Sequence, residues 1–202
     1  MQTPEWYQRD VSRETSDKLT AYADLLRKWT KKINLVSKSS VDDLEHRHIW
    51  DSAQIYEPFE GEWLDFGSGG GLPAIVVAIL AQGEGLKPTM TLMESDQRKA
   101  TFLRACAREL ALPLNIVVSR IENVQPTGAT VISARALADL DHLLELSAGH
   151  LATNGQCLFM KGASWQQEVD AARENWSFSC DARQSHTNPQ AAILRIKEIE
   201  RV

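Results

Sequence analysis

The residues best suited to chemistry lie in a glycine-rich segment, DFGSGGG at 65–71. Glycine at Gly67, Gly69 and Gly71 lets the backbone turn tightly and approach a ligand without a Cβ in the way. The apolar run before the segment predicts a short buried strand, and the run after it predicts a helix whose first turn presents unpaired N–H groups. This arrangement favours a ligand that contains a nucleotide over a loop that only reverses the chain.

Glu94 supplies an acid that such a site requires. It ends the next predicted strand, 89–94, about twenty residues beyond the loop. A carboxylate at that position accepts hydrogen bonds from both hydroxyls of a ribose. The loop and the acid together predict a nucleoside-binding site, but they do not say which nucleoside it binds.

Two nucleotide-binding patterns compete for the same loop. Gly69, Gly71 and Ala74 match G-x-G-x-x-A, a dinucleotide pattern for NAD or FAD. Asp65 and the three alternating glycines match D-x-G-x-G-x-G, the loop of S-adenosylmethionine-dependent methyltransferases. Asp65 favours the second pattern, because an acid before the first glycine suits a ligand with an ammonium and a sulfonium group. An NAD(P)-binding oxidoreductase is the alternative.

The whole chain has the composition of an ordinary globular protein of 202 residues. Its longest apolar run, 72–81, is shorter than the ~20 residues that a membrane span requires, and 1–10 lack the apolar core of a secretory signal. Its three cysteines are widely spaced, which indicates reduced thiols. We therefore expect a cytoplasmic protein with no membrane partner. The net charge of −5 argues against nonspecific coating of nucleic acid but allows a local basic patch.

The elements that hold the loop alternate between strand and helix, which predicts a parallel sheet covered on both faces. The fold class is α/β: a doubly wound, Rossmann-like domain over 61–202 with an antiparallel C-terminal edge, preceded by an N-terminal helical extension over 1–60. Strands are expected at 63–66, 89–94, 114–119, 130–136, 155–161, 176–185 and 191–199, and helices at 12–33, 41–59, 72–82, 96–110 and 137–151.

Six segments of the chain, which include the glycine loop and Glu94, carry a resemblance to a known family. They occur in the order and spacing of RsmG, also called GidB, the bacterial ribosomal small-subunit methyltransferase G family. The segments are RHIWDS (47–52), DFGSGGGLP (65–73), LMES with RKATFL (92–95 and 98–103), SRIE (119–122), ISARAL (132–137) and FMKG (159–162). The resemblance implies methylation of N7 of a guanine in 16S rRNA, with S-adenosylmethionine as donor and S-adenosylhomocysteine as product. The partner is then 16S rRNA in the small subunit or its assembly intermediate.

The resemblance also implies roles for individual residues. Gly67, Leu72 and Arg135 match positions that contact the cofactor, and Ile121 and Glu122 match positions beside the adenine; Gly69 and Glu94 join them on the physical argument above. No catalytic residue is assigned, because guanine N7 carries a free lone pair and needs no general base. No metal site is expected either, and the chain shows no strong dimer signal, so a monomer is expected.

The substrate side of an rRNA enzyme must be locally basic, and a cluster of cations ends the first predicted helix and begins the second. The residues that we expect to bind substrate are Lys28, Lys32, Arg47, His48 and Lys161. Each has an alternative: the lysines of the cluster can be a solvated helix face, His48 a buried hydrogen-bonded residue, and Lys161 a salt bridge. A small-molecule methyltransferase is a further alternative, which the basic cluster disfavours.

Overall fold

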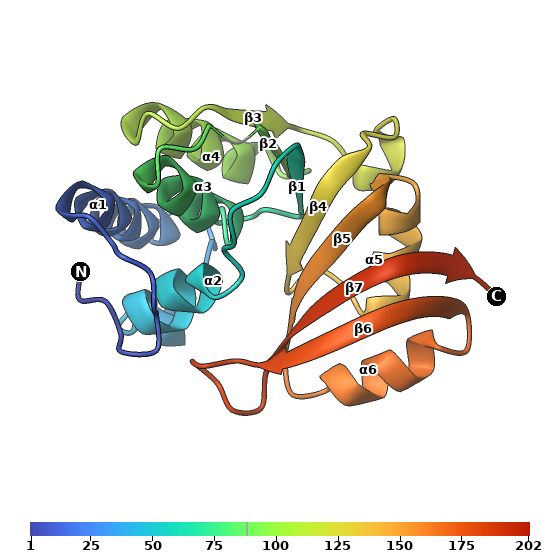
Figure 1. Ribbon diagram of the computed structural model, residues 1–202. Helices are drawn as coiled ribbons and strands as arrows, with labels where there is room; N and C mark the ends of the chain where they lie inside the picture. The colour runs from blue at the N-terminus through green and yellow to red at the C-terminus, as the bar shows by residue number, and fades with distance from the viewer. Residues whose placement is uncertain (88) are drawn as a thin grey trace.

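A seven-stranded sheet forms the centre of the computed structural model, which describes residues 1–87 and 89–202 (Figure 1). The strand order is β3-β2-β1-β4-β5-β7-β6. The strands are β1 (Glu62–Phe66), β2 (Thr89–Met93), β3 (Leu114–Val117), β4 (Ala129–Arg135), β5 (Leu151–Lys161), β6 (Trp176–Gln184) and β7 (Ala192–Arg201). The first five run parallel, whereas β7 is antiparallel to both β5 and β6. This confirms the doubly wound sheet with an antiparallel C-terminal edge.

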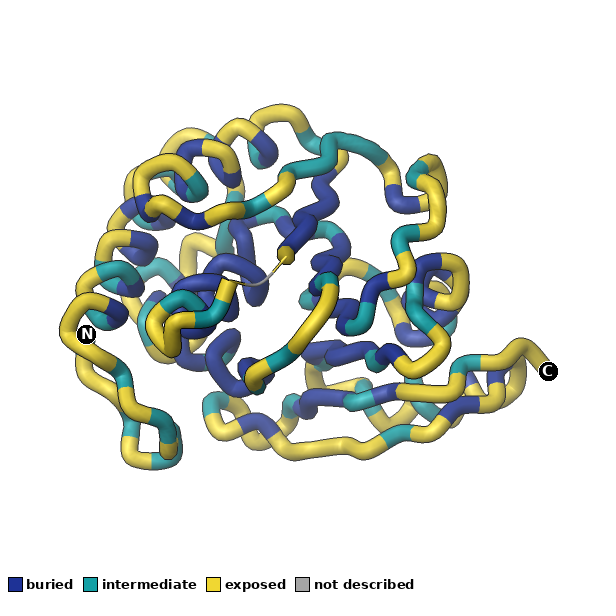
Figure 2. Tube along the Cα trace, turned by 45° about the horizontal axis from the view of Figure 1, so that its top comes forward, coloured by how far each residue is buried: buried dark blue, intermediate teal, exposed yellow. Residues whose placement is uncertain are grey.

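Helices cover both faces of this sheet (Figure 1). The helices are α1 (Arg13–Thr30), α2 (Asp51–Ala53), α3 (Ala74–Gly83), α4 (Gln97–Glu109), α5 (Leu140–Ala148) and α6 (Trp165–Ala172). Successive strand residues point to opposite faces, so Trp63 packs in the core beneath α1 to α4, whereas Leu64 packs with α5 and α6. Both residues are buried, as parallel strands in such a sheet require. Figure 2 shows buried, dark blue backbone through the middle of the molecule.

The N-terminal helix α1 packs on the same core as α3. Ser12 caps it by accepting a hydrogen bond from the Thr15 backbone N–H at 3.1 Å, and its apolar stripe of Leu19, Tyr22 and Leu26 is fully buried. The Tyr22 hydroxyl donates to the carbonyl of Gly70 at 2.5 Å. The predicted N-terminal extension therefore supports the glycine loop directly.

The second predicted helix, 41–59, is wrong in its form. The structure has a short 3₁₀ turn, Lys38–Ser40, then a π-helical segment, Glu45–Trp50, and only three residues of α-helix in α2. Leu44 stands at the N-cap of the π-helical segment, so the helical part begins later than the predicted 41. The helix ends at Ala53 rather than near 59. The helical partner of the Gln54 carbonyl would be the N–H of residue 58, but Pro58 has none, and the carbonyl accepts from the Arg183 guanidinium instead.

Smaller differences concern element ends. Pro73 stands just before α3 rather than in its first turn, and α5 begins at Leu140 rather than at 137, because Asp139 caps it by accepting from the His142 backbone N–H at 3.0 Å. Helix α6 is absent from the sequence prediction; it connects β5 to β6. The predicted start of the helix at 96 is confirmed, since Asp96 caps α4 by accepting from the Arg98 backbone N–H at 2.8 Å.

Candidate active site

The glycine loop joins β1 to α3 at the carboxyl end of the sheet. Gly67, Gly69 and Gly71 have positive φ angles of 62°, 51° and 80°, which side chains rarely allow. A Cβ on Gly71 would lie 2.3 Å from Ile75 Cδ1, and one on Gly67 would lie 2.6 Å from Leu137 Cδ1. The backbone conformation therefore favours glycine at all three positions. A side chain at Gly71 would also collide with the packed side chains of Ile75 and Leu103, whereas one at Gly67 would displace the half-exposed Leu137.

Glu94 lies against this loop. Its Oε2 accepts a hydrogen bond from the backbone N–H of Gly69 at 2.8 Å, and its Oε1 accepts from that of Asp96 at 2.7 Å. The residue is 6 % exposed. A carboxylate has about four acceptor positions, so Glu94 keeps two of them for further donors, such as the two hydroxyls of a ribose.

Asp65 is buried beneath the same loop. The Trp63 indole N–H donates to the Ser133 hydroxyl at 2.7 Å, and that hydroxyl donates to Asp65 Oδ1 at 2.5 Å. Asp65 Oδ2 is buried with no hydrogen-bond partner among the described residues. Burial raises the pKa of Asp65 to about 7, although the hydrogen bond from Ser133 opposes the shift. An acid that lacks a partner beneath the loop fits a ligand that carries an ammonium group.

The other expected cofactor positions lie along the same edge of the sheet. Leu72 continues the glycine loop and is buried. Ile121 and Glu122 form a 3₁₀ turn after β3, with Ile121 buried and Glu122 exposed. Because β1, β2 and β3 are neighbours, these residues lie on the same half of the edge as Glu94. The donor and acceptor groups present therefore fit S-adenosylmethionine.

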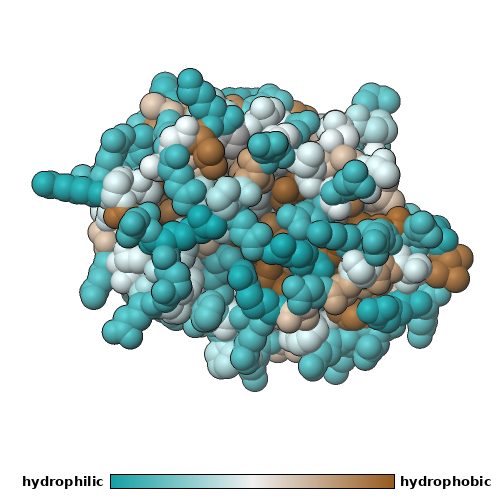
Figure 3. Space-filling model, in the orientation of Figure 1, coloured by the Kyte–Doolittle hydropathy of each residue, from teal (hydrophilic) through white to brown (hydrophobic). Residues whose placement is uncertain are grey.

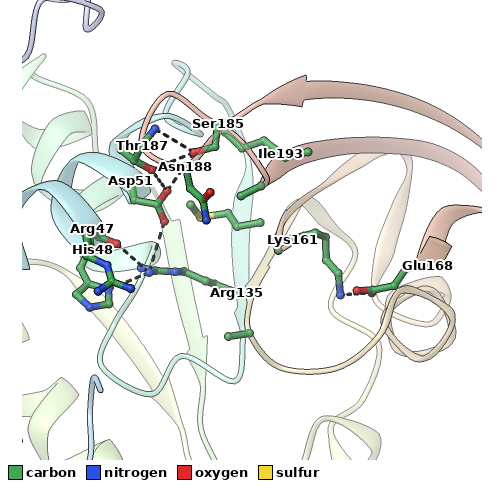
Figure 4. Close-up of a pocket in the computed structure, with 15 residues that line it drawn as sticks. Arg47, His48, Asp51, Arg135, Lys161, Glu168, Ser185, Thr187, Asn188 and Ile193 are labelled. Carbon is green, nitrogen blue, oxygen red and sulfur yellow. Dashed lines mark hydrogen bonds and ion pairs between the residues drawn. The ribbon is translucent and has the colours of Figure 1, made fainter. Parts of the chain in front are cut away.

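Arg135 ends β4, where it lines a cavity of about 390 Å³ (Figure 4). Its Nη2 donates to the carbonyl of Arg47 at 3.0 Å and to His48 Nδ1 at 2.8 Å, and lies 3.5 Å from the carboxylate of Asp51. Its Nη1 is buried without a partner in the part of the chain that the structure describes. Residues that line the cavity include Arg47, His48, Asp51, Arg135, Lys161, Glu168, Ser185, Thr187 and Asn188.

His48 is held inside the protein by both ring nitrogens. The Ser40 hydroxyl donates to the carbonyl of Ser37 at 2.8 Å, so it accepts from His48 Nε2, which lies 2.7 Å away. Nδ1 must then be the lone pair that accepts from Arg135, because a guanidinium only donates. Burial, reinforced by Arg135, lowers the pKa of His48 to about 4. The geometry matches the buried, hydrogen-bonded alternative for His48.

Lys161 is also engaged within the protein. Its ammonium donates to the carbonyl of Ala138 at 2.7 Å and pairs with Glu168 at 2.5 Å, and only 9 % of the side chain is exposed. These contacts match the salt-bridge alternative, with the difference that the pair is largely buried. Lys161 thereby ties α6 to the segment that follows β4 and carries Leu137.

The remaining expected substrate residues are exposed. Arg47 lies at the cavity, where its guanidinium also reaches the carbonyl of Ser39 at 3.4 Å. Lys28 faces a shallow groove beside Glu109 of α4, and Lys32 follows the end of α1. The structure therefore brings Arg47, His48 and Lys161 together at one cavity and leaves the two lysines on the surface outside it.

Five polar residues of the cavity were missed as site residues: Asp51, Glu168 on α6, which was itself not predicted, and three residues of one turn. Asp51 lies within the segment RHIWDS, so its chemistry was visible in the sequence but had no assigned partner. Ser185, Thr187 and Asn188 lie in the turn between β6 and β7. The polar run HTNPQ marks this turn, but nothing local indicates that it reaches the end of β4.

Most of the face seen in Figure 3 is hydrophilic, and Leu137 and Val202 are the large hydrophobic side chains recorded as exposed among the described residues. Leu137, 39 % exposed, lies over Gly67 between the loop and the cavity. Within 1–87 and 89–202, no cluster of three His, Cys, Asp or Glu side chains is arranged to hold a metal ion. No helix there is long and apolar enough to cross a membrane.

The sheet order, the glycine loop and the acid after β2 define the class: this is the class I fold of S-adenosylmethionine-dependent methyltransferases. Solved structures agree. TYW2 of M. jannaschii, in complex with AdoMet, has a TM-score of 0.59 at 14 % identity over 86 % of this chain and 80 % of that one. A putative S-adenosyl-L-methionine-dependent methyltransferase of Methanococcus maripaludis has a TM-score of 0.58 at 11 % identity over 96 % of this chain and 97 % of that one.

A family model described as GidB, rRNA small subunit methyltransferase G, matches residues 15–194. The chain therefore belongs to the GidB family. Ribosomal RNA small subunit methyltransferase G of Ruegeria sp. (strain TM1040) is 53 % identical over 195 residues, which cover 96 % of this chain and 95 % of the relative. The protein of the same name from Ruegeria pomeroyi is 46 % identical over 204 residues, covering both chains fully.

Proposed function

We propose that this protein transfers the methyl group of S-adenosylmethionine to N7 of a guanine in 16S rRNA. One observation carries the proposal. Phe66 and Ala134 are register partners in neighbouring strands, so the glycine loop and Arg135 begin side by side. The loop with Glu94 lies on one side of this point and the cavity lined by cations lies on the other. A cofactor site and a substrate site thus meet at the carboxyl edge of the sheet, where strand order reverses.

The cofactor half is assigned from its donors and acceptors. Glu94 would accept the ribose hydroxyls, and Asp65 beneath the loop would face the ammonium end. Leu72, Ile121 and Glu122 would enclose the adenine half, and Arg135 would offer its free Nη1 to an acceptor. When bound, S-adenosylmethionine supplies an electrophilic methyl group; the chain holds and orients it.

The substrate half would hold the target base. A cavity of about 390 Å³ lies within the usual range for small-ligand sites, roughly 300–1,000 Å³. Guanine N7 attacks through its own lone pair, so the chain contributes alignment, which can be worth several kcal/mol. The methylated base gains a positive charge, which hydroxyl or carbonyl oxygens at the cavity would stabilise.

The RNA-binding surface would be the exposed cations around this cavity. Arg47 lies at the cavity itself, and Lys28 and Lys32 extend the surface along the end of α1. We assign His48 and Lys161 to the same substrate site in an indirect role, since their polar atoms are used inside the protein. We expect a monomer that acts in the cytoplasm, on the small subunit or its assembly intermediate.

The test is transfer of label from methyl-tritiated S-adenosylmethionine to small subunits from cells that lack the gene. We expect label in 7-methylguanosine of 16S rRNA and none in free nucleosides. Label at another ring position, or equal activity on free nucleosides, would refute the assignment. A thermal-shift titration addresses the cofactor separately: S-adenosylhomocysteine should stabilise the protein, and NAD should not.

Charge reversal tests the RNA surface. The variant Lys28→Glu with Lys32→Glu should weaken small-subunit binding and reduce its salt dependence, because each phosphate contact contributes to the salt slope. The matched control is Lys197→Glu, an exposed lysine on β7. Equal salt slopes for the wild type and the double variant would show that α1 does not contact phosphate.

A further inference from the structure

The carboxylate of Asp51 connects two walls of the cavity (Figure 4). Its Oδ1 accepts hydrogen bonds from the hydroxyl of Thr187 and from the hydroxyl of Ser185 at 3.4 Å. Its Oδ2 lies 3.5 Å from Nη2 of Arg135. Asp51 itself belongs to α2, so one side chain joins three segments that are far apart in the sequence.

Gln54, one turn after Asp51, strengthens one of these connections. Its amide nitrogen donates to the carboxylate of Asp51 at 3.1 Å and to the Ser185 hydroxyl at 3.1 Å. Its amide oxygen accepts from the backbone N–H of His186 at 2.7 Å. The turn between β6 and β7 is therefore tied to α2 through polar side chains, and Asn188 of the same turn lines the cavity.

The connection to Arg135 rests on charge. The guanidinium is largely buried, with 20 % of the side chain exposed, and its other near neighbours, His48 and the carbonyl of Arg47, are neutral. A buried cation is costly without a counter-charge. Among the described residues Asp51 is the acid paired with Arg135, so it supplies the counter-charge, while the hydrogen bonds to His48 and to the carbonyl of Arg47 hold the guanidinium from the other side.

We propose that Asp51 is a positioning residue that fixes the distance between the β6–β7 turn and Arg135. This inference rests on the proposed function, in which Arg135 faces the cofactor and the turn faces the target base. Asp51 then aligns the two reactants without touching either. Loss of its charge leaves Arg135 without a counter-charge, whereas loss of its acceptor oxygens leaves the turn tied to α2 by Gln54 alone.

Three variants separate the two connections. Asp51→Asn keeps an acceptor oxygen for the turn but removes the charge, and Asp51→Ala removes both. Thr187→Val removes the donor on the turn while keeping its shape. Glu57→Gln is the matched control. Like Asp51, Glu57 is an acid that pairs with an arginine, Arg195 on β7, but it does not line this cavity.

In methyl transfer to small subunits, Asp51→Asn should lower kcat by up to about 100-fold, the cost of a misplacement of about 1 Å, with KM for the subunit nearly unchanged. Thr187→Val should raise that KM. In the Asp51→Ala background Thr187→Val should have no added effect, because both act through one carboxylate. Glu57→Gln should leave kcat and KM at wild-type values. Wild-type kcat and KM in Asp51→Asn and Asp51→Ala would overturn the proposal.

Hydrogen exchange on the ligand-free protein provides a readout without substrate. Asp51→Ala should speed exchange of the amides of 185–190, and Glu57→Gln should not. Exchange equal to wild type in Asp51→Ala would overturn the proposal even if kcat falls. If the wild type methylates no rRNA, the proposed function fails, and exchange at the turn together with S-adenosylhomocysteine affinity in Asp51→Asn still tests the role of Asp51.

Discussion

Replacing Glu94 by alanine tests the cofactor site most directly. In the structure its carboxylate accepts two backbone hydrogen bonds, from Gly69 at 2.8 Å and from Asp96 at 2.7 Å. A hydrogen bond to a charged group contributes about 1.5–3 kcal/mol. Both donors are partly exposed, so water can replace part of the two lost hydrogen bonds. We therefore expect Glu94→Ala to lower the free energy of unfolding by about 2 kcal/mol.

The effect on the ligand is expected to be larger. The two acceptor positions that remain on Glu94 are the ones assigned to the ribose. Losing two hydrogen bonds to a charged acceptor costs about 3 kcal/mol at the low end of the range, which corresponds to roughly 100-fold weaker binding of S-adenosylhomocysteine. Glu94→Gln keeps one acceptor oxygen but turns an amide N–H₂ toward a backbone donor. This variant should therefore bind S-adenosylhomocysteine with an affinity between those of the wild type and Glu94→Ala.

Isothermal titration with S-adenosylhomocysteine measures the affinity, and urea unfolding measures the stability. The control is Glu62→Ala. Glu62 lies at the amino end of β1, at the other end of the strands from the glycine loop, and accepts from the Thr91 hydroxyl at 2.7 Å. It should lose stability without losing affinity. A folded Glu94→Ala protein that binds S-adenosylhomocysteine as tightly as the wild type would refute the ribose assignment.

Three further predictions concern residues around the site. The pKa of His48 is lowered from 6.5 to about 4, so between these values the unfolded chain binds a proton that the native state does not; its contribution to stability is complete above pH 6.5 and is lost as pH falls toward 4. Urea unfolding at pH 5 and 7.5 should show a smaller acid loss for His48→Gln than for the wild type, and equal losses would contradict this. The pKa of Asp65 is raised from 3.8 to about 7, so its contribution is complete below pH 3.8 and is lost as pH rises through 7. The gain in unfolding free energy of ligand-free Asp65→Asn over the wild type should therefore be larger at pH 8 than at pH 5, and a constant difference would count against a protonated Asp65. Gly67→Ala should cost about 1–2 kcal/mol for its left-handed backbone and displace Leu137, whereas Gly149→Ala, which has an ordinary backbone conformation and open space around it, should not; equal melting temperatures for the two would refute the need for glycine at Gly67.

Much of the fold could be read from local patterns in the sequence. Strand and helix periodicity, and caps such as Asp96, depend on residues within about four positions of one another. The glycine loop and Glu94 are likewise separated only by one strand–helix unit, whose geometry is nearly constant. For this reason the class of fold and the placement of Glu94 beside the glycine loop were predictable.

The other half of the site depends on contacts that no local pattern encodes. Asp51 meets Ser185 and Thr187 across more than 130 residues, and His48 meets Arg135 across 87. A π-helical segment stands at 45–50, where a regular helix was predicted, and the network buries side chains that composition assigns to the surface. The sequence by itself therefore determined the sheet, the glycine loop and the family, because short-range sterics and hydrophobic pattern specify them. Only the tertiary structure decided that His48 and Lys161 form their polar contacts inside the protein and that Asp51 contacts both the β6–β7 turn and Arg135. Desolvation and the pairing of charges depend on which distant segments meet.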